Sequence, residues 1–475
     1  MNKSLVKISI LSISLLTVMS SAAISPALAE IAKAFKGTDP TLIKLVLTLP
    51  SLLIIPFSLI GGWLATRMKK KTVLLLGLVI YFLGGVGGGF AKSIVQLLII
   101  RGIFGIGVGL IIPLSMSLIA DYFQQEERAK LTGLSGSVSH FGGVLFLLLS
   151  GWLACLNWRY AFAVYGLSLF IIFIIIFWLP EQESKGTTGI AKSKLPFNVF
   201  VCSLLGTLMM VAFYAAPINL AMFIENDRMI YKSVSTLFKD KAEFEAHLLK
   251  GTISQTTIDS FKNNGINISP SAVLAVKEPS KKWSITDNKK EYIVIKENGA
   301  LVVSLKRMGR PGIAGYFLSS MTMVGVFSGI ILTLLLRWFG PFCSVVGLVS
   351  MAVGYAVLGA SSSLFEVFIS MICIGFSSGV LMPLLILRVA KITPAAQRAF
   401  AMAIVSVGIY LGQFLSPVIL KAATSFPGRD SFRGQFNFLA VCLAIATIVG
   451  IYIAIKTVKT VGFKEYASGT GPVHH

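Results

Sequence analysis

Acidic side chains are scarce in this sequence. Twenty Asp and Glu residues occur among 475, against 42 Lys and Arg, and there are four His. Charged residues make up 13% of the chain, where soluble domains carry about 25%. Hydrophobic residues make up 55%, and the mean hydropathy is +0.82. This composition excludes an ordinary soluble protein and indicates a chain that crosses a membrane many times.

Signatures of nucleotide and metal chemistry are also missing. The sequence holds no Walker loop, dinucleotide fingerprint, HExxH or CxxC, so it predicts no enzyme, no cofactor and no metal site. Its five cysteines are single residues in or beside apolar runs, which is typical of packing residues. The net charge of +22 does not predict a nucleic-acid partner, because Lys and Arg gather in short loops between apolar runs.

Long apolar runs are abundant. A membrane-spanning helix needs about 20 apolar residues, and roughly twelve such runs start near residues 7, 41, 72, 94, 129, 159, 197, 311, 341, 364, 399 and 435. The sequence therefore predicts an all-α membrane protein. Placing the N-terminus in the cytoplasm puts 18 Lys and Arg in the short cytoplasmic loops and termini and about eight in the opposite loops. This bias predicts that both termini are cytoplasmic.

The first 29 residues have the pattern of a secretory signal peptide, with a basic start, an apolar middle and Ala27-Leu28-Ala29. However, Pro26 in "AAISPALA" has a counterpart deep in the chain, Pro217 in "YAAPINLA". No signal peptide lies at that second position. We therefore expect the stretch to be retained as the first span, with Glu30 at its outer end.

The chain contains an internal repeat. Three residues at the end of the fourth span recur 270 positions later, at the end of the tenth: Gly105 with Gly375, Gly109 with Gly379, and Pro113 with Pro383. Pro26 and Pro217 are separated by 191 positions, which is 79 fewer. The offsets of 270 and 191 positions are both explained if the chain consists of two parallel six-span halves and about 79 residues are inserted after span seven.

The repeat sets the expected domain boundaries. They are a six-helix bundle at 1–180, a cytoplasmic linker at 181–196, helix 7 at 197–224, an inserted domain at 225–310, and the rest of the second bundle with a cytoplasmic tail at 311–475. The inserted segment carries 15 Lys and Arg and 10 Asp and Glu. Its "KAEFEAHLL" and "TTIDSFKNN" are helix-like, and "EYIVIKENGALVVSL" is typical of a β-hairpin with an Asn-Gly turn. We expect a small α+β extracytoplasmic domain.

Two stretches carry recognisable motifs. "GGWLATRMKKKTVLL" resembles a Gly-x-Leu-Ala-Asp-Arg-x-Gly-Arg-Arg/Lys loop, and Thr66 stands where the aspartate is usual. "RGIFGIGVGLIIP" resembles Arg-x-x-x-Gly-x-Gly-x-Gly on a fourth span. With the twelve spans and two halves, these motifs resemble the twelve-span drug/proton antiporter branch of the major facilitator superfamily. Of that branch's fifth-span Gly-Pro-x-x-Gly-Gly run, the aligned "FLLLSGWLA" keeps only Gly151.

The resemblance implies roles for several residues. The loop between spans two and three would act as a gate, and its cations also suit a topology anchor; its residues are Gly62, Arg67, Lys70 and Lys71. Glycines and prolines of spans four and ten would let helices pack closely; these are Gly105, Gly107, Gly109, Pro113, Gly375, Gly379 and Pro383.

A proton-coupled carrier needs a titratable or charged group within the membrane. The candidates for proton coupling or substrate binding are Arg101, His140 and Glu30. His140 either titrates or is a neutral, hydrogen-bonded interface residue. Polar residues expected to line a cavity are Tyr214, Asn219, Tyr410 and Gln413. The lack of intramembrane carboxylates favours neutral, zwitterionic or anionic amphiphiles as substrates.

These features predict a secondary active multidrug exporter in the cytoplasmic (inner) membrane of a bacterium. It would export drug-like compounds or a metabolite such as a siderophore by alternating access, in exchange for protons, as a monomer in the lipid bilayer. One alternative is an organic-anion uptake carrier with Arg101 as substrate anchor. Another is a receptor or assembly protein that acts through the inserted domain, whose role as a cap, a substrate site or a site for an outer partner stays open.

Overall fold

We describe a computed structural model of residues 1–475. It describes all residues except 1–2, 18–21, 124, 182–195, 227–235, 238–254, 256–257, 260–261, 263–272, 279–281, 288–289, 298–299, 307–309, 395–396, 425–431 and 462–475. The chain divides into two compact units. One is a helical bundle formed by residues 1–226 and 310–475, and the other covers residues 227–309.

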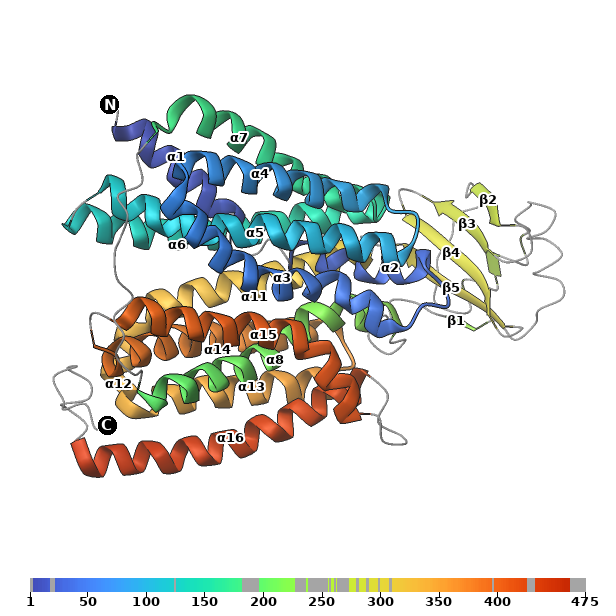
Figure 1. The fold of residues 1–475 in the computed structure, drawn as a ribbon. Helices are drawn as coiled ribbons and strands as arrows, with labels where there is room; N and C mark the ends of the chain where they lie inside the picture. Colours follow the sequence, from blue (N-terminus) through green and yellow to red (C-terminus); the bar gives the residue numbers. More distant parts are fainter. Residues whose placement is uncertain are drawn as a thin grey trace. The chain divides into compact units, whose positions relative to one another are not determined.

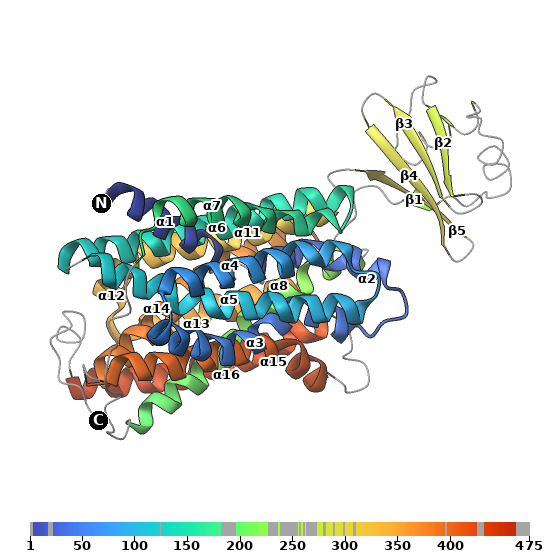
Figure 2. The ribbon, with the colours of Figure 1, turned by 45° about the horizontal axis from the view of Figure 1, so that its top comes forward.

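The bundle consists of two halves (Figures 1 and 2). The elements of the N-terminal half are α1 (Lys3–Thr17), η1 (Ala22–Ala27), α2 (Leu28–Ala34), α3 (Pro40–Arg67), α4 (Lys70–Gly87), η2 (Gly88–Phe90), α5 (Ile94–Tyr122), α6 (Gln125–Leu156), η3 (Tyr160–Gly166) and α7 (Leu167–Trp178). Those of the C-terminal half are α8 (Phe197–Asn226), α11 (Arg310–Ile330), α12 (Leu332–Phe339), η4 (Gly340–Phe342), α13 (Cys343–Ala360), α14 (Leu364–Ile392), α15 (Arg398–Thr424) and α16 (Phe432–Val461).

Two directions along the bundle are needed below. We call the end where α1 begins and α16 finishes the terminal end, at the left of Figure 1, and the other end the opposite end. Eleven helices within the described residues are long and apolar enough to cross a membrane. The predicted first span instead consists of α1, η1 and α2, and the apolar part of α1 covers only Ser4–Leu16. The predicted count of twelve spans is therefore not confirmed.

The predicted repeat is visible in the helix boundaries. Helices α5 and α14 both have 29 residues, and both their first and last residues are 270 positions apart. Each is capped at its start by a serine side chain, since Ser93 accepts from the Gln96 backbone N–H and Ser363 from that of Glu366. Such caps satisfy backbone donors that the first turn leaves unpaired.

An arginine in each half also closes an equivalent turn. Arg159 donates to the carbonyls of Gly89 and Ala91, at 3.0 and 2.6 Å. Arg433 donates to the carbonyls of Gly359 and Ser361, which lie 270 positions after those two acceptors. The 270-residue offset of the repeat therefore also relates these two turns.

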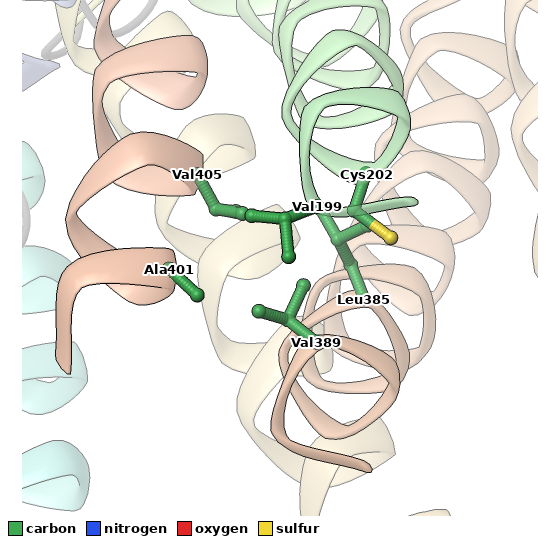
Figure 3. Close-up of a cluster of buried hydrophobic side chains, with 6 residues drawn as sticks. All are labelled: Val199, Cys202, Leu385, Val389, Ala401 and Val405. Carbon is green, nitrogen blue, oxygen red and sulfur yellow. The ribbon is translucent and has the colours of Figure 1, made fainter. Parts of the chain in front are cut away.

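Each half has its own apolar core. In the C-terminal half, α8, α14 and α15 meet in a cluster that Figure 3 shows, formed by Val199, Cys202, Leu385, Val389, Ala401 and Val405. Cys202 is buried there, and none of the five cysteines, all of which lie in the described part of the chain, forms a disulfide. Cys202 and Cys343 are buried, whereas Cys155 and Cys442 are exposed, so the packing role predicted for the cysteines stays a prediction.

The second unit contains a five-stranded antiparallel sheet in the order β1-β5-β4-β3-β2. The strands are β1 (Thr236–Leu237), β2 (Val273–Glu278), β3 (Lys282–Asp287), β4 (Lys290–Glu297) and β5 (Ala300–Lys306). The predicted hairpin is confirmed, because β4 pairs with β5 and Glu297 lies opposite Ala300. Trp283 and Val294 are cross-strand partners, and both are fully buried. The two predicted helices, at 241–249 and 256–264, fall largely outside the described residues.

Candidate functional site at the seam between the halves

Two helix pairs form the seam between the halves. Helix α3 packs against α15, and α6 packs against α11. In the first pair, buried Ser51 donates to the side-chain oxygen of Gln413 at 2.8 Å. In the second, Ser319 donates to the Val144 carbonyl at 3.1 Å. Nearer the opposite end, Ser25 donates to the Pro217 carbonyl, so the two repeat-related Pro segments meet.

Ion pairs join the halves at the opposite end. Lys33 on α2 contacts Glu30 on the same helix at 3.0 Å and also pairs with Glu225 at the end of α8. Asp39, which caps α3, lies 2.6 Å from the Lys421 ammonium on α15. The Glu225 side chain is 8% exposed and that of Asp39 is 45% exposed, so the carboxylate of Glu225 is far better shielded from solvent. Sequence reasoning missed Glu225 because it placed the end of span seven one residue earlier.

The close approach of α6 and α11 depends on glycine. A methyl group at Gly151 would stand 2.9 Å from the Pro311 carbonyl oxygen, and one at Gly315 would stand 2.7 Å from the Leu147 carbonyl oxygen. Gly312 similarly faces the Cys155 sulfur. Real side chains essentially never come this close, so only glycine fits at Gly151 and Gly315. The sole glycine that survives from the fifth-span signature therefore lies at the contact between the halves.

Three ion pairs at the terminal end join residues of the N-terminal half to one another. Lys7 pairs with Glu127, and Lys70 with Asp121, each at 2.6 Å. Lys69 pairs with Glu181. The inter-half contacts described above, by contrast, lie between the middle of the bundle and the opposite end. The structure thus holds its halves together at the opposite end.

The predicted gating loop is part of this terminal network. Lys70 donates to Asp121 and Ser117 on α5, and Lys71 donates to the Ile176 carbonyl on α7. The Arg67 guanidinium lies 4.7 Å from the centre of the Trp63 ring. Gly62 has open space at its Cα, so packing does not require glycine there. These contacts anchor the loop to its own half, and its role as a gate stays a prediction.

Arg101 is fully buried inside the N-terminal half. Its Nε donates to the Val46 carbonyl at 2.9 Å, and its Nη1 donates to the Tyr165 hydroxyl at 3.2 Å. The guanidinium also lies 4.4 Å from the centre of the Phe104 ring. Tyr81 packs against both Phe104 and Tyr165. This setting ties α3, α5 and η3 together around a cation, which indicates a positioning role within the half.

His140 lies on the face of α6 that meets the other half. His140, Val144, Leu147 and Gly151 recur at intervals of four, three and four residues, which places them on one helix face. Val144, Leu147 and Gly151 all contact α11. Half-buried His140 is one turn closer to the terminal end, just beyond these contacts. It is thus placed where a change in the seam would alter its surroundings.

The four residues predicted to line a cavity belong to α8 and α15, which pack against each other. Tyr214 and Asn219 are buried on α8, and neither amide atom of Asn219 has a hydrogen-bond partner among the described residues. Tyr410, on α15, is near enough to Tyr214 for the two phenols to interact electrostatically. Gln413 accepts from Ser51. A buried amide without partners is costly, so Asn219 is a good candidate for contact with a ligand.

The predicted packing residues lie where helices nearly touch. A methyl group at Gly105 would be 2.6 Å from the Pro50 carbonyl oxygen on α3, and one at Gly375 would come even closer to the Met321 carbonyl oxygen on α11. Gly107, Gly109 and Gly379 likewise face neighbouring helices without room for a side chain. Pro113 and Pro383 lie within α5 and α14. The described part of the chain contains no cluster of His, Cys, Asp or Glu that could hold a metal ion.

Comparison with known proteins agrees with this architecture. Residues 10–238 match the sequence model of the Major Facilitator Superfamily. The chain is 32% identical over 131 residues to the multidrug transporter protein MdtP of Bacillus subtilis, covering 27% of this chain and 24% of that protein. It is 28% identical over 185 residues to the quinolone resistance protein NorA of Staphylococcus aureus, covering 37% of this chain and 46% of that protein. The matches thus span between a quarter and half of these relatives' length.

Solved structures extend the likeness to nearly the whole chain. The inward-open xylose transporter XylE from E. coli superimposes with a TM-score of 0.60 at 16% identity, covering 94% of both chains. The nucleoside transporter NupG superimposes with a TM-score of 0.64 at 10% identity, covering 95% of this chain and 99% of that one. At such identities the likeness concerns the fold alone. Together, the comparisons show that the chain has the fold of these transporters and that its residues 10–238 match the Major Facilitator Superfamily in sequence.

Proposed function

We propose that this transporter exports small amphiphilic molecules, drug-like compounds or a metabolite, by alternating access and in exchange for protons. The observation that carries the proposal is the seam. The halves are tied from their middle to the opposite end, through Ser51–Gln413, Gly151–Pro311 and Asp39–Lys421. If the basic terminal end faces the cytoplasm, this arrangement is an inward-facing state, from which a cytoplasmic substrate enters.

The substrate class follows from relatives and from charge. MdtP and NorA are named as multidrug and quinolone resistance transporters. Helices α8 and α15 offer Gln413, Asn219, Tyr214 and Tyr410 as polar groups, and α6 offers half-buried His140. Neutral side chains of this kind suit neutral, zwitterionic or anionic amphiphiles better than simple cations. We therefore expect substrates that carry apolar surface and few positive charges.

We also assign proton exchange to residues at the seam between the two halves. His140 lies one turn before Val144, whose carbonyl accepts from Ser319 on α11, and Lys33 bridges Glu30 and Glu225 at the opposite end. Opening the opposite end must separate Lys33 from Glu225, since they belong to different halves. Protonation of either carboxylate would weaken that bridge, and deprotonation would restore it. Proton binding and the opening of the opposite end are thereby linked.

The direct test measures transport in inside-out membrane vesicles. We expect an acid interior to drive accumulation of a fluorescent anionic or zwitterionic amphiphile, with fluorescence quenching as the readout, and addition of substrate to move protons outward. Accumulation of monovalent cations alone would contradict the proposed substrate class. Transport that does not move protons would contradict the coupling.

Replacing His140 tests its part in coupling. We expect His140→Gln to lose most of the accumulation driven by an imposed pH gradient, while exchange of labelled for unlabelled substrate without a gradient continues. The amide keeps a hydrogen-bonding side chain but cannot titrate in this pH range. Phe141→Leu, at the exposed neighbouring position, serves as the matched control. If His140→Gln keeps gradient-driven accumulation at the level of Phe141→Leu, His140 is not the coupling group.

Asp39→Asn should weaken the opposite-end tie without changing the pH profile of transport. The hydrogen bond from Lys421 lowers the pKa of Asp39 from 3.8 to about 2. A carboxyl group whose pKa is lowered on folding stabilises the protein at pH values above its ordinary pKa. This stabilisation is lost as the pH falls toward the lowered pKa of about 2. The pair is therefore complete between about pH 5 and 8. Exposed ion pairs contribute about 0.2–1 kcal/mol, so we expect up to about a fivefold change in rate at every pH.

That prediction is checked by measuring initial transport rates of both proteins from pH 5 to pH 8. A ratio that is constant across this range agrees with it. A variant whose pH optimum moves would show that Asp39 titrates during transport.

The alternative of organic-anion uptake depends on Arg101 as the substrate anchor. The hydrogen bonds of Arg101 to Val46 and Tyr165 keep it inside one half rather than at the seam. This location favours export over that alternative. Vesicles of opposite orientation distinguish the two directions of transport.

A further inference from the structure

A surface pocket lies at the terminal end of the N-terminal half, away from the seam. It has a volume of about 310 Å³ and is bounded by the start of α1, the start of α4 and the end of α7. Its lining consists of Leu5, Val6, Lys71, Phe177, Trp178, Leu179 and Pro180. One cation, one indole and otherwise apolar side chains thus surround a single space.

The neighbouring lysines have acidic partners, and Lys71 is bonded differently. Lys69 pairs with Glu181, and Lys70 pairs with Asp121. Lys71 donates to the Ile176 backbone carbonyl at 2.8 Å. Glu181 is also within electrostatic reach of Lys71, but its hydrogen bond comes from Lys69. An ammonium group has three donors, so Lys71 can bond to Ile176 and still donate to a ligand in the pocket.

Two exposed apolar stripes lead away from the pocket along neighbouring helices. On α7, the exposed residues Phe170, Phe173 and Phe177 recur at intervals of three and four residues. On α4, which packs against α7, the stripe is Leu76, Val79 and Leu83. These surfaces face lipid in a membrane-spanning bundle. Phe177 belongs both to its stripe and to the pocket, so the two surfaces are continuous.

We propose that this pocket binds the phosphate headgroup of an anionic phospholipid. The Lys71 ammonium and the Trp178 indole N–H donate to the phosphate, and the acyl chains lie along the stripes on α4 and α7. Basic pockets between helices at the cytoplasmic membrane surface suit such headgroups, and indole rings favour the membrane interface. The apolar lining and its continuity with the stripes favour a lipid over free phosphate.

The test uses the full-length purified protein in detergent with defined lipids. Native mass spectrometry would count bound phosphatidylglycerol and phosphatidylcholine at equal supplied concentrations. We expect a preference for phosphatidylglycerol that falls about fivefold in Lys71→Gln, since one lysine near an anionic lipid surface contributes about 1 kcal/mol. Lys71→Arg should keep the preference. Lys69→Gln is the matched control, because Lys69 is exposed and does not line the pocket.

Trp178→Phe provides a second test that leaves Lys71 and its bond to α7 intact. It removes the indole donor, and we expect a smaller loss of lipid preference. Equal retention of both lipids by the unmodified protein would overturn the proposal, as would equal losses in Lys71→Gln and Lys69→Gln. Displacement of the lipid by an excess of inorganic phosphate would show a free-anion site instead.

Discussion

Leucine at Gly151 or Gly315 is expected to abolish transport while each half stays folded. Either side chain would stand where the backbone of the partner helix now lies, so α6 and α11 could not close at the opposite end. Overpacking of this kind costs about 1–3 kcal/mol, and each 1.4 kcal/mol changes an equilibrium about tenfold. We therefore expect transport to fall about tenfold or more, measured as initial rates in inside-out vesicles.

Gly136→Leu is the matched control on the same helix. Nothing lies within 4 Å of a methyl group built at Gly136, so this variant should transport at close to the unmodified rate. Expression and detergent-extracted yield should be similar for all three variants. Normal transport by Gly151→Leu would contradict the assignment of this contact as the closed seam.

Arg101→Leu is expected to lower thermal stability sharply. It removes a fully buried cation together with its bonds to Val46 and Tyr165. Leaving these two buried polar groups without this donor costs about 1–3 kcal/mol each, which corresponds to a drop of roughly 10 °C in the melting temperature of a domain of this size. Arg101→Lys should lose less thermal stability than Arg101→Leu, because lysine keeps the positive charge. It should still lose some, because an ammonium group lacks the planar fork with which Arg101 bonds to both Val46 and Tyr165.

Arg67→Gln provides the comparison, because Arg67 is exposed and stacks on Trp63. Its melting temperature should differ little from that of the unmodified protein. If Arg101→Leu melts normally and loses only the pH dependence of transport, Arg101 is a coupling group rather than a positioning residue.

The repeat made much of the bundle predictable. Gly105 with Gly375 and Pro113 with Pro383 fixed a 270-residue offset, and the boundaries of α5 and α14 follow that offset. The β4–β5 hairpin was predictable from its Asn-Gly turn. Local patterns of this kind are strong because helix packing and turn geometry constrain the residue types directly.

Contacts between distant segments were not predictable in the same way. Lys33 pairs with Glu225, and Asp39 pairs with Lys421. No local sequence pattern around these four charged residues indicates which of them meet. The first span was expected as one helix, yet the segment around Pro26 forms the 3-10 helix η1. Proline alone does not explain this departure, because the repeat-related Pro217 lies within the continuous helix α8.

Alternating access is most directly tested by measuring the separation of the halves at both ends of the bundle. Spin labels at Thr72 and Arg388 report on the terminal end, and labels at Lys36 and Ala422 on the opposite end; all four positions are exposed. The background would be a cysteine-free variant with confirmed transport. On adding substrate and a proton gradient, we expect a new population with a shorter Thr72–Arg388 distance and a longer Lys36–Ala422 distance. If both distances stay fixed during transport, or if both lengthen together, the protein does not work by alternating access.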